Sequence, residues 1–170
     1  MRKTILVSFL TVVFFWTCNL FAFDVKKVNQ VKELVNRAAE YLAKTGDLNA
    51  FNDPKNPDFV KLPLYVFVYQ CEEKKVILKA HPFVHKLVGK NIAFLKDKMG
   101  KFFALDLCRQ VKAHPQGAWA SYYWLNPKTK KIEEKFTYIK QVEGTPYQVA
   151  AGLYKNDLGS DVTLDKLNSY

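Results

Sequence analysis

Two of the three histidines, His81 and His85, are four residues apart in the stretch KAHPFVHKLVGKN at residues 79–91. On a helix this spacing places both imidazoles on one face, where they can hold a metal ion. However, Pro82 directly follows His81, and a residue before proline is pushed out of the α-helical region. We therefore expect His81 in extended backbone at the end of a strand, and no metal site in this stretch.

The other side chains capable of chemistry form no recognisable catalytic set. His114 also precedes a proline, and no third metal ligand has suitable spacing. Cys71 and Cys108 show no local signature of a nucleophile paired with a histidine. The chain has only seven glycines and no glycine-rich phosphate loop, and no pair of carboxylates stands out. We expect a protein that is not an enzyme and has no catalytic residues, metal or cofactor.

The N-terminal segment, residues 1–22, is typical of an export signal. Arg2 and Lys3 precede an apolar run at residues 5–16, and Ala22 is a plausible last residue of the signal. The run is short for a membrane span, which needs roughly 20 residues. We expect a periplasmic or secreted protein. The alternatives are an uncleaved N-terminal anchor and lipoprotein processing at Cys18, although FWTC fits the latter signal poorly.

Charge and cysteine content describe the mature chain. Cleavage after Ala22 removes two of 26 basic residues and none of the 16 acidic ones, so the net charge falls from +10 to +8. The lysines are scattered and arginine, the usual residue for phosphate and base recognition, is nearly absent, so we expect no nucleic-acid partner. Cys71 and Cys108 remain, and an oxidising compartment permits a disulfide between them. Two buried free thiols are the alternative.

The expected elements alternate between helical and strand periodicity. Apolar residues three and four apart predict a helix over residues 24–45, capped by Asp24 and ended by Gly46. A loop with one helical turn near residues 48–51 follows. Strands are expected at 64–70, 76–80, 118–125, 135–142 and 147–154, with a helix within 100–114 and a polar hairpin at 126–134. A polar tail at 157–170 follows, with room for one short helix. The short links imply antiparallel pairing and an α+β fold.

Several motifs in order carry a family resemblance. His-Pro at a strand end is followed by LVGKN, LKDKMGKFF and then GAWASYYWLNPKTKKIEEKFTYIKQVEGTPYQVAAGLY. Over about residues 31–154 the chain resembles the single Cache domain family of extracytoplasmic sensory modules of bacterial receptors. The resemblance implies a PAS-like domain at residues 23–156, in which a long N-terminal helix packs on a five-stranded antiparallel sheet. Family ligands are often small organic acids such as acetate, propionate, lactate or pyruvate.

The resemblance also implies a ligand pocket on the sheet face away from the helix. A carboxylate pocket needs a few donors among apolar walls. By the family pattern the candidate ligand-binding residues are Phe67, His81, Phe103, Tyr122, Trp124, Lys135 and Tyr138. Lys135 would supply charge, the tyrosines hydroxyls, and His81 a donor that couples binding to pH. Each has a structural alternative: aromatic packing, a solvated lysine, or a histidine at a strand end.

Strand alternation limits this set. Tyr122 and Trp124 share one strand face, whereas Lys135 and Tyr138 are three apart and point to opposite faces unless a bulge separates them.

Family members are usually tethered by transmembrane helices, and this chain is expected to be a stand-alone exported protein that serves a membrane receptor. The leading hypothesis is a binding module for a small anion, which a buried lysine without an acidic neighbour would favour. The alternative is a secreted protein-interaction domain whose pocket is filled by its own side chains.

Overall fold

The long N-terminal helix, α1 (Val25–Thr45), begins and ends where the sequence predicts. The computed structural model describes residues 23–170, so the predicted signal peptide lies outside the described residues. The Asp24 side chain accepts a hydrogen bond from the Lys27 N–H at 3.1 Å, which satisfies one of the unpaired donors of the first turn. Gly46 ends the helix with φ at 64°, a left-handed conformation that glycine adopts without strain.

The sheet has six antiparallel strands and not the expected five. The order is β1-β2-β6-β5-β4, and β3 also pairs with β2. The strands are β1 (Val60–Lys61), β2 (Leu64–Cys71), β3 (Val76–Ala80), β4 (Ala118–Leu125), β5 (Ile132–Gln141) and β6 (Tyr147–Tyr154). The additional strand is β1, whose two residues pair back onto β2. A two-residue strand has no alternation by which a sequence could reveal it.

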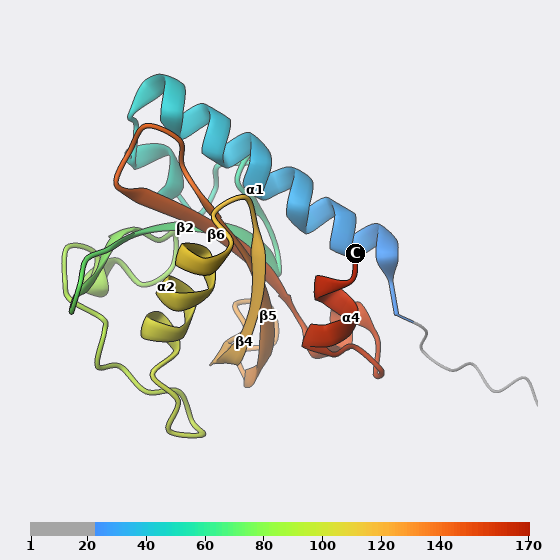
Figure 1. Ribbon diagram of the computed structural model, residues 1–170. Helices are drawn as coiled ribbons and strands as arrows, with labels where there is room; N and C mark the ends of the chain where they lie inside the picture. Colours follow the sequence, from blue (N-terminus) through green and yellow to red (C-terminus); the bar gives the residue numbers. More distant parts are fainter. Residues whose placement is uncertain (1–22) are drawn as a thin grey trace, which may run out of the picture.

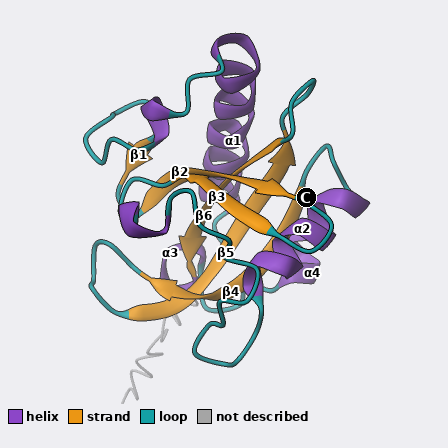
Figure 2. Ribbon diagram, turned by 90° about the vertical axis from the view of Figure 1, so that its left-hand side faces the viewer, coloured by secondary structure: helices purple, strands orange, loops and turns teal. Residues whose placement is uncertain are grey.

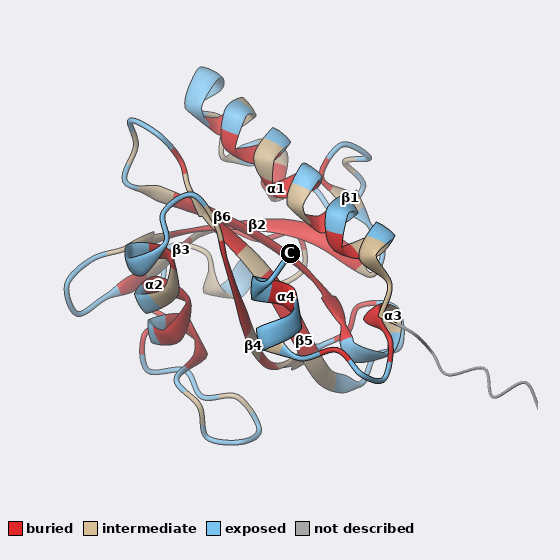
Figure 3. Ribbon diagram, turned by 45° about the vertical axis from the view of Figure 1, so that its right-hand side comes forward, coloured by how far each residue is buried: buried red, intermediate tan, exposed pale blue. Residues whose placement is uncertain are grey.

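Two layers of side chains cover the two faces of the sheet. Helix α1 crosses one face and the second long helix, α2 (Phe103–Ala113), lies on the other (Figure 1). Figure 2 shows the sheet from the side on which α2 and the loop before it lie. The buried residues of α1 face the sheet (Figure 3), and they form one core with Leu64, Val66 and Val68 of β2. The odd-numbered residues of β2 belong to the second core, beneath α2.

The last residues do not behave as a polar tail. They form two short helices, α3 (Lys155–Leu158) and α4 (Leu164–Asn168). Leu158, Val162 and Leu167 are buried in the same core as α1. The expected hairpin at 126–134 is also shorter than predicted, because β5 begins at Ile132.

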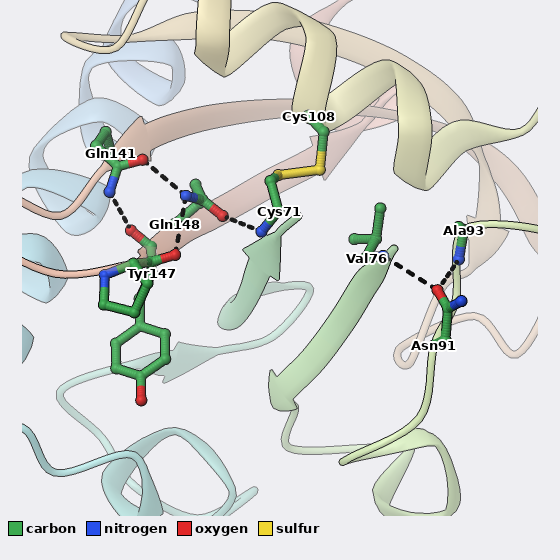
Figure 4. Close-up of a disulfide and its surroundings, with 9 residues drawn as sticks. Cys71, Val76, Asn91, Ala93, Cys108, Gln141, Tyr147 and Gln148 are labelled. Carbon is green, nitrogen blue, oxygen red and sulfur yellow. Dashed lines mark hydrogen bonds between the residues drawn. A yellow bond between two sulfur atoms is a disulfide. The ribbon is translucent and has the colours of Figure 1, made fainter. Parts of the chain in front are cut away.

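A disulfide joins the end of β2 to α2. Cys71 and Cys108 are bonded to each other across 37 residues of sequence (Figure 4). The sequence allowed either a disulfide or two buried free thiols, and the structure contains the disulfide. Beside it, the Gln148 side chain accepts a hydrogen bond from the Cys71 N–H at 2.8 Å. The bridge therefore fixes α2 over the second core.

Within residues 23–170 no helix is both long and apolar enough to cross a membrane.

Candidate functional site

A small apolar cavity lies between the sheet and the segment that leads from β3 into α2. Its volume is about 20 Å³, room for about one water molecule. Sheet and helix residues form its floor and one wall, and loop residues 84–95 cover it. The lining residues are Phe67, Leu78, His81, Val84, Leu87, Ile92, Leu95, Phe103, Tyr122 and Trp124.

Five of the seven residues proposed from the sequence line this cavity. Tyr122 and Trp124 project from one face of β4, as strand alternation predicts, and both contact Phe103 of α2. The Phe103 ring centroid is 4.9 Å from that of Tyr122 and 5.2 Å from that of Trp124. Phe67 and His81 complete the five. The structure thus brings these residues together, whereas their part in ligand binding stays a prediction.

The His81 ring has a defined hydrogen-bonding role. Its Nδ1 accepts hydrogen bonds from the backbone N–H groups of Phe83 at 3.0 Å and Val84 at 3.3 Å. An Nδ1 that accepts carries no proton, so in the neutral ring the proton is on Nε2. Burial lowers the pKa of His81 well below its ordinary value, and the charges of Lys135 and His85 lower it further. His81 therefore offers a neutral N–H donor at the cavity wall.

His85 does not join His81 in a metal site. It lies in a short 3-10 turn, His85–Leu87, and its Nε2 is 2.8 Å from the Pro82 carbonyl oxygen. His81 lies just after the end of β3, as the proline that follows it predicts. Across residues 23–170 no three His, Cys, Asp or Glu side chains cluster as metal ligands.

Lys135 is the most unusual side chain in the domain. It lies in β5 between β4 and β6, with none of its surface exposed. Its Nζ has no hydrogen-bond partner among the described residues, and burial lowers the pKa of the amine well below its ordinary value. The Nζ lies 3.8 Å from the ring centroid of Tyr65 and 5.2 Å from that of Phe67. Phe67 also lines the cavity, so Lys135 and the cavity have this ring as a common neighbour.

Tyr138 does not lie at this site, contrary to the sequence prediction. The pairing of β5 with β6 is regular from Lys135 to Tyr138, with no bulge between them. Tyr138 consequently points to the α1 side of the sheet. Its ring lies 5.2 Å from that of Trp119 and 5.6 Å from the Lys32 amine.

Two tyrosines beside Lys135 were missed by the sequence prediction. Tyr65 is two residues before Phe67 on the same face of β2, and its ring centroid is 5.1 Å from that of His81. Tyr154 pairs directly with Lys135 across the β5–β6 ladder, and its hydroxyl donates to the Leu125 carbonyl at 2.8 Å. Burial raises the pKa of Tyr65 well above its ordinary value. Tyr65 could have been found from the sequence, because it is two residues from Phe67 and so lies on the same strand face. Tyr154 could be found only from the pairing register of β5 with β6, which the sequence does not show.

Two of the motifs quoted above hold the cover of the cavity in place. Asn91, from LVGKN, accepts hydrogen bonds from the N–H groups of Val76 at 3.0 Å and Ala93 at 3.1 Å, which ties the loop to β3 (Figure 4). Asp97, from LKDKMGK, accepts from the N–H groups of Lys101 and Tyr123, both at 3.0 Å. These motif residues thus shape the cover and do not themselves line the cavity.

A second, larger concavity lies between α1 and the β1 edge of the sheet. Its volume is about 630 Å³, but it is an open groove whose lining includes bases such as Lys27 and Arg37 and acids such as Glu33 and Glu40. Charges of both signs at an open surface are largely solvated and select poorly for one small ion. The small cavity is the better candidate, because it has buried donors and apolar walls.

Comparison with known proteins agrees with this architecture. A solved structure of a methyl-accepting chemotaxis protein from Vibrio parahaemolyticus shares the fold, with 19% identity over 79% of this chain and 92% of that one and a TM-score of 0.60. A periplasmic sensor domain of a chemotaxis protein shares it with 20% identity over 76% of this chain and 91% of that one and a TM-score of 0.55. A Cache chemosensory domain described for its carboxylic acid recognition shares it with 16% identity over 76% of this chain and 89% of that one and a TM-score of 0.56. No curated protein matches the chain. The sequence model of a family described as Single Cache domain 2 matches residues 25–165. The chain therefore belongs to the single Cache domain 2 family.

Proposed function

We propose that this protein is an extracytoplasmic sensory module that binds a small organic acid and reports its occupancy to a membrane receptor. Lys135 carries the proposal, because its amine is fully buried and has no hydrogen-bond partner among the described residues. A buried cation is costly unless an anion or hydrogen bonds compensate it. A carboxylate within reach would supply that compensation and bring Lys135 back to its charged form.

The surroundings of Lys135 fit a small carboxylate. The neutral His81 ring provides a second donor, and the walls of Phe67, Phe103 and Trp124 suit a short alkyl group. The solved Cache domain described for carboxylic acid recognition shares the fold, which makes this ligand class the first to test. No catalytic chemistry is needed for this role, and we propose binding without turnover.

The small size of the cavity implies that binding moves the cover. A carboxylate with even two carbons needs more room than the about 20 Å³ present. Val84, Leu87 and Leu95 come from the loop that covers the cavity, and their outward movement would enlarge it without disturbing the sheet. Movement of this loop would also give a receptor partner a signal to detect.

The same small volume favours a second candidate function. Aromatic rings fill most of the space over the sheet at this site. Seven ring pairs form among six residues: Tyr65, Phe67, His81, Phe103, Tyr122 and Trp124. If these rings are the permanent filling, the domain is a secreted protein-interaction module and has no small ligand.

A thermal-shift screen separates the two functions. The screen covers small mono- and dicarboxylates, amino acids and amines. A ligand at 100 times its dissociation constant adds about 2.7 kcal/mol, which is roughly 2 to 8 °C for a domain of this size. We expect one class of acid to raise the melting temperature, and Lys135→Met to abolish the shift.

Tyr138→Phe is the matched control, since Tyr138 is on the same strand but faces α1. This variant should keep the full shift. Equal loss in both variants would mean that the shift does not report the proposed site. Absence of a shift with every compound, checked by calorimetry, would support the filled-pocket alternative.

A further inference from the structure

The segment that covers the cavity also exposes several large apolar side chains to solvent, close to one another in the sequence. Phe94 is 72% exposed and Met99 71% exposed, and Phe102 and Leu105 continue the series into the start of α2. Lysines are interspersed with them along the chain. We call this surface the lid patch; it consists of Lys90, Phe94, Lys96, Lys98, Met99, Phe102 and Leu105.

The lid patch combines bases with aromatic rings in space as well as in sequence. The Lys96 amine lies 4.7 Å from the Phe102 ring centroid, and the Lys98 amine lies 4.0 Å from that of Tyr123. Lys90, Lys96 and Lys98 are all exposed. Within the part of the chain that the structure describes, none of the three takes part in an ion pair.

The acidic groups of this region are already used internally. Asp106 is buried and pairs with the Lys101 amine at 2.6 Å and with the Arg109 guanidinium at 2.8 Å. Asp97 accepts hydrogen bonds from backbone N–H groups, which lower the pKa of its carboxyl although burial opposes them. The charge that the lid patch presents to a partner is therefore positive.

The exposed apolar groups are held outward by ordered backbone. Asp97 bonds to the N–H groups of Met99 at 2.9 Å and Lys101 at 3.0 Å, and Gly100 allows the tight turn with φ at 81°. Several large apolar residues exposed on one short segment are the kind of feature that marks a surface for a partner.

We propose that the lid patch docks on an anionic lipid surface. Phe94, Met99 and Phe102 would enter the boundary between headgroups and acyl chains, and the flanking lysines would meet lipid phosphates. Protein partners are the less suitable occupants, since lysine is depleted from protein interfaces and tyrosine, tryptophan and arginine are enriched there. Arg109, an exposed arginine at the end of the same region, is paired with Asp106.

This docking would place the cover of the cavity at the membrane. Leu95 and Phe103, which line the cavity, are the immediate neighbours of Phe94 and Phe102 in the chain. The inference does not depend on the identity of the ligand or on whether the cavity binds one.

Co-sedimentation with vesicles tests the proposal. The full-length chain is mixed with vesicles of phosphatidylglycerol and phosphatidylcholine in equal parts, and with vesicles of phosphatidylcholine alone. We expect binding to the anionic vesicles that weakens as salt is raised. Phe94→Ser/Met99→Ser and, separately, Lys96→Glu/Lys98→Glu should each weaken it by at least about tenfold.

The controls separate the lid patch from general surface charge. Lys26→Glu/Lys44→Glu makes the same charge change on the exposed side of α1, and Leu62→Ser removes an exposed leucine at the β1 edge. Both should bind like the unchanged protein, and circular dichroism should show every variant folded. Residues 1–22 are identical in all samples, so a difference between variants cannot come from them.

Two kinds of result would overturn the proposal. One is the absence of binding to anionic vesicles by the unchanged protein. The other is equal binding by the lid-patch variants and the controls, because the attachment would then come from net charge or from another segment. In the first case, pull-down of a protein partner through the lid patch would identify that protein as the occupant in place of the lipid surface.

Discussion

Lys135 shows how a single residue can favour function at the expense of stability. Its amine lies beside the rings of Tyr65 and Phe67 but lacks a hydrogen-bond partner within residues 23–170. An unsatisfied buried polar group costs about 1 to 3 kcal/mol. Such a cost is understandable where a bound anion removes it, as in sites that are strained or unsatisfied for functional reasons.

Lys135→Met should therefore stabilise the protein and abolish carboxylate binding. The methionine has a similar length and no amine, so we expect the free energy of unfolding at neutral pH to rise by about 1 to 3 kcal/mol. Urea unfolding followed by circular dichroism measures it, and the thermal-shift screen measures binding. A variant that is less stable, or that keeps the ligand-induced shift, would contradict this account of Lys135.

The same residue predicts a pH dependence of stability. In the unfolded chain the lysine keeps its proton up to about pH 10.5, whereas in the folded protein burial lowers the pKa well below that value. Between the two pKa values the unfolded state binds more protons, so this group makes stability rise with pH. The advantage of Lys135→Met should be largest below the folded pKa and shrink as pH approaches 10.5, because only the part that comes from the charge depends on pH. A constant difference between the two proteins across this range would show that the amine is not buried as described.

At the level of single residues, the sequence predicts which side chains lie together better than it predicts how deeply a side chain is buried. Spacing alone indicates that Tyr122 and Trp124 lie together and that Pro82 keeps His81 out of a helix. The complete burial of Lys135 follows from strands on both sides of β5 and from Tyr65 and Tyr154 above it, and these are contacts between distant segments. A lysine on a hairpin strand is normally solvated, so no local pattern could show the exception.

Among the secondary-structure elements, those with clear periodicity could be predicted and those without it could not. Helix α1 has apolar residues at helical spacing, and strands β2 to β6 are apolar or alternating runs bounded by turn residues. Strand β1 is two residues long, and α3 and α4 are only four and five residues long. Such short elements are stabilised by the core onto which they pack and not by their own pattern.

The disulfide is the principal covalent link between elements, and its loss should affect stability more than architecture. It joins β2 to α2 across 37 residues, so the chain-entropy estimate gives about 3 to 4 kcal/mol. Cys71→Ala/Cys108→Ala should lower the free energy of unfolding by that amount in urea titrations. A reductant should lower the unchanged protein to the same level and leave the double variant unaffected. Equal stability with and without reductant would show that the bridge contributes little.

At the scale of the whole molecule, the domain has one core on each side of the sheet, and the C-terminal residues belong to the core beneath α1. Their hydrophobic residues are few and irregularly spaced, which is why the sequence reads as a polar tail. The family match also extends past residue 156, to residue 165. The boundary of the folding unit can thus be tested by truncation.

Deleting residues 157–170 should destabilise the domain strongly. It removes the buried side chains of Leu158, Val162 and Leu167, each worth about 1.5 to 3 kcal/mol on full burial. It also removes the Leu158 carbonyl, which accepts a hydrogen bond from the Asp24 N–H at 2.9 Å at the start of α1. Allowing for the entropy that the freed segment regains, we expect a loss of at least about 3 kcal/mol in urea unfolding. Removing only residues 169–170, both exposed, is the matched control and should cost little. If the longer deletion left stability unchanged, the domain would end at residue 156 and its C-terminal helices would be appendages; a large loss would show that they complete the surface on which α1 is held.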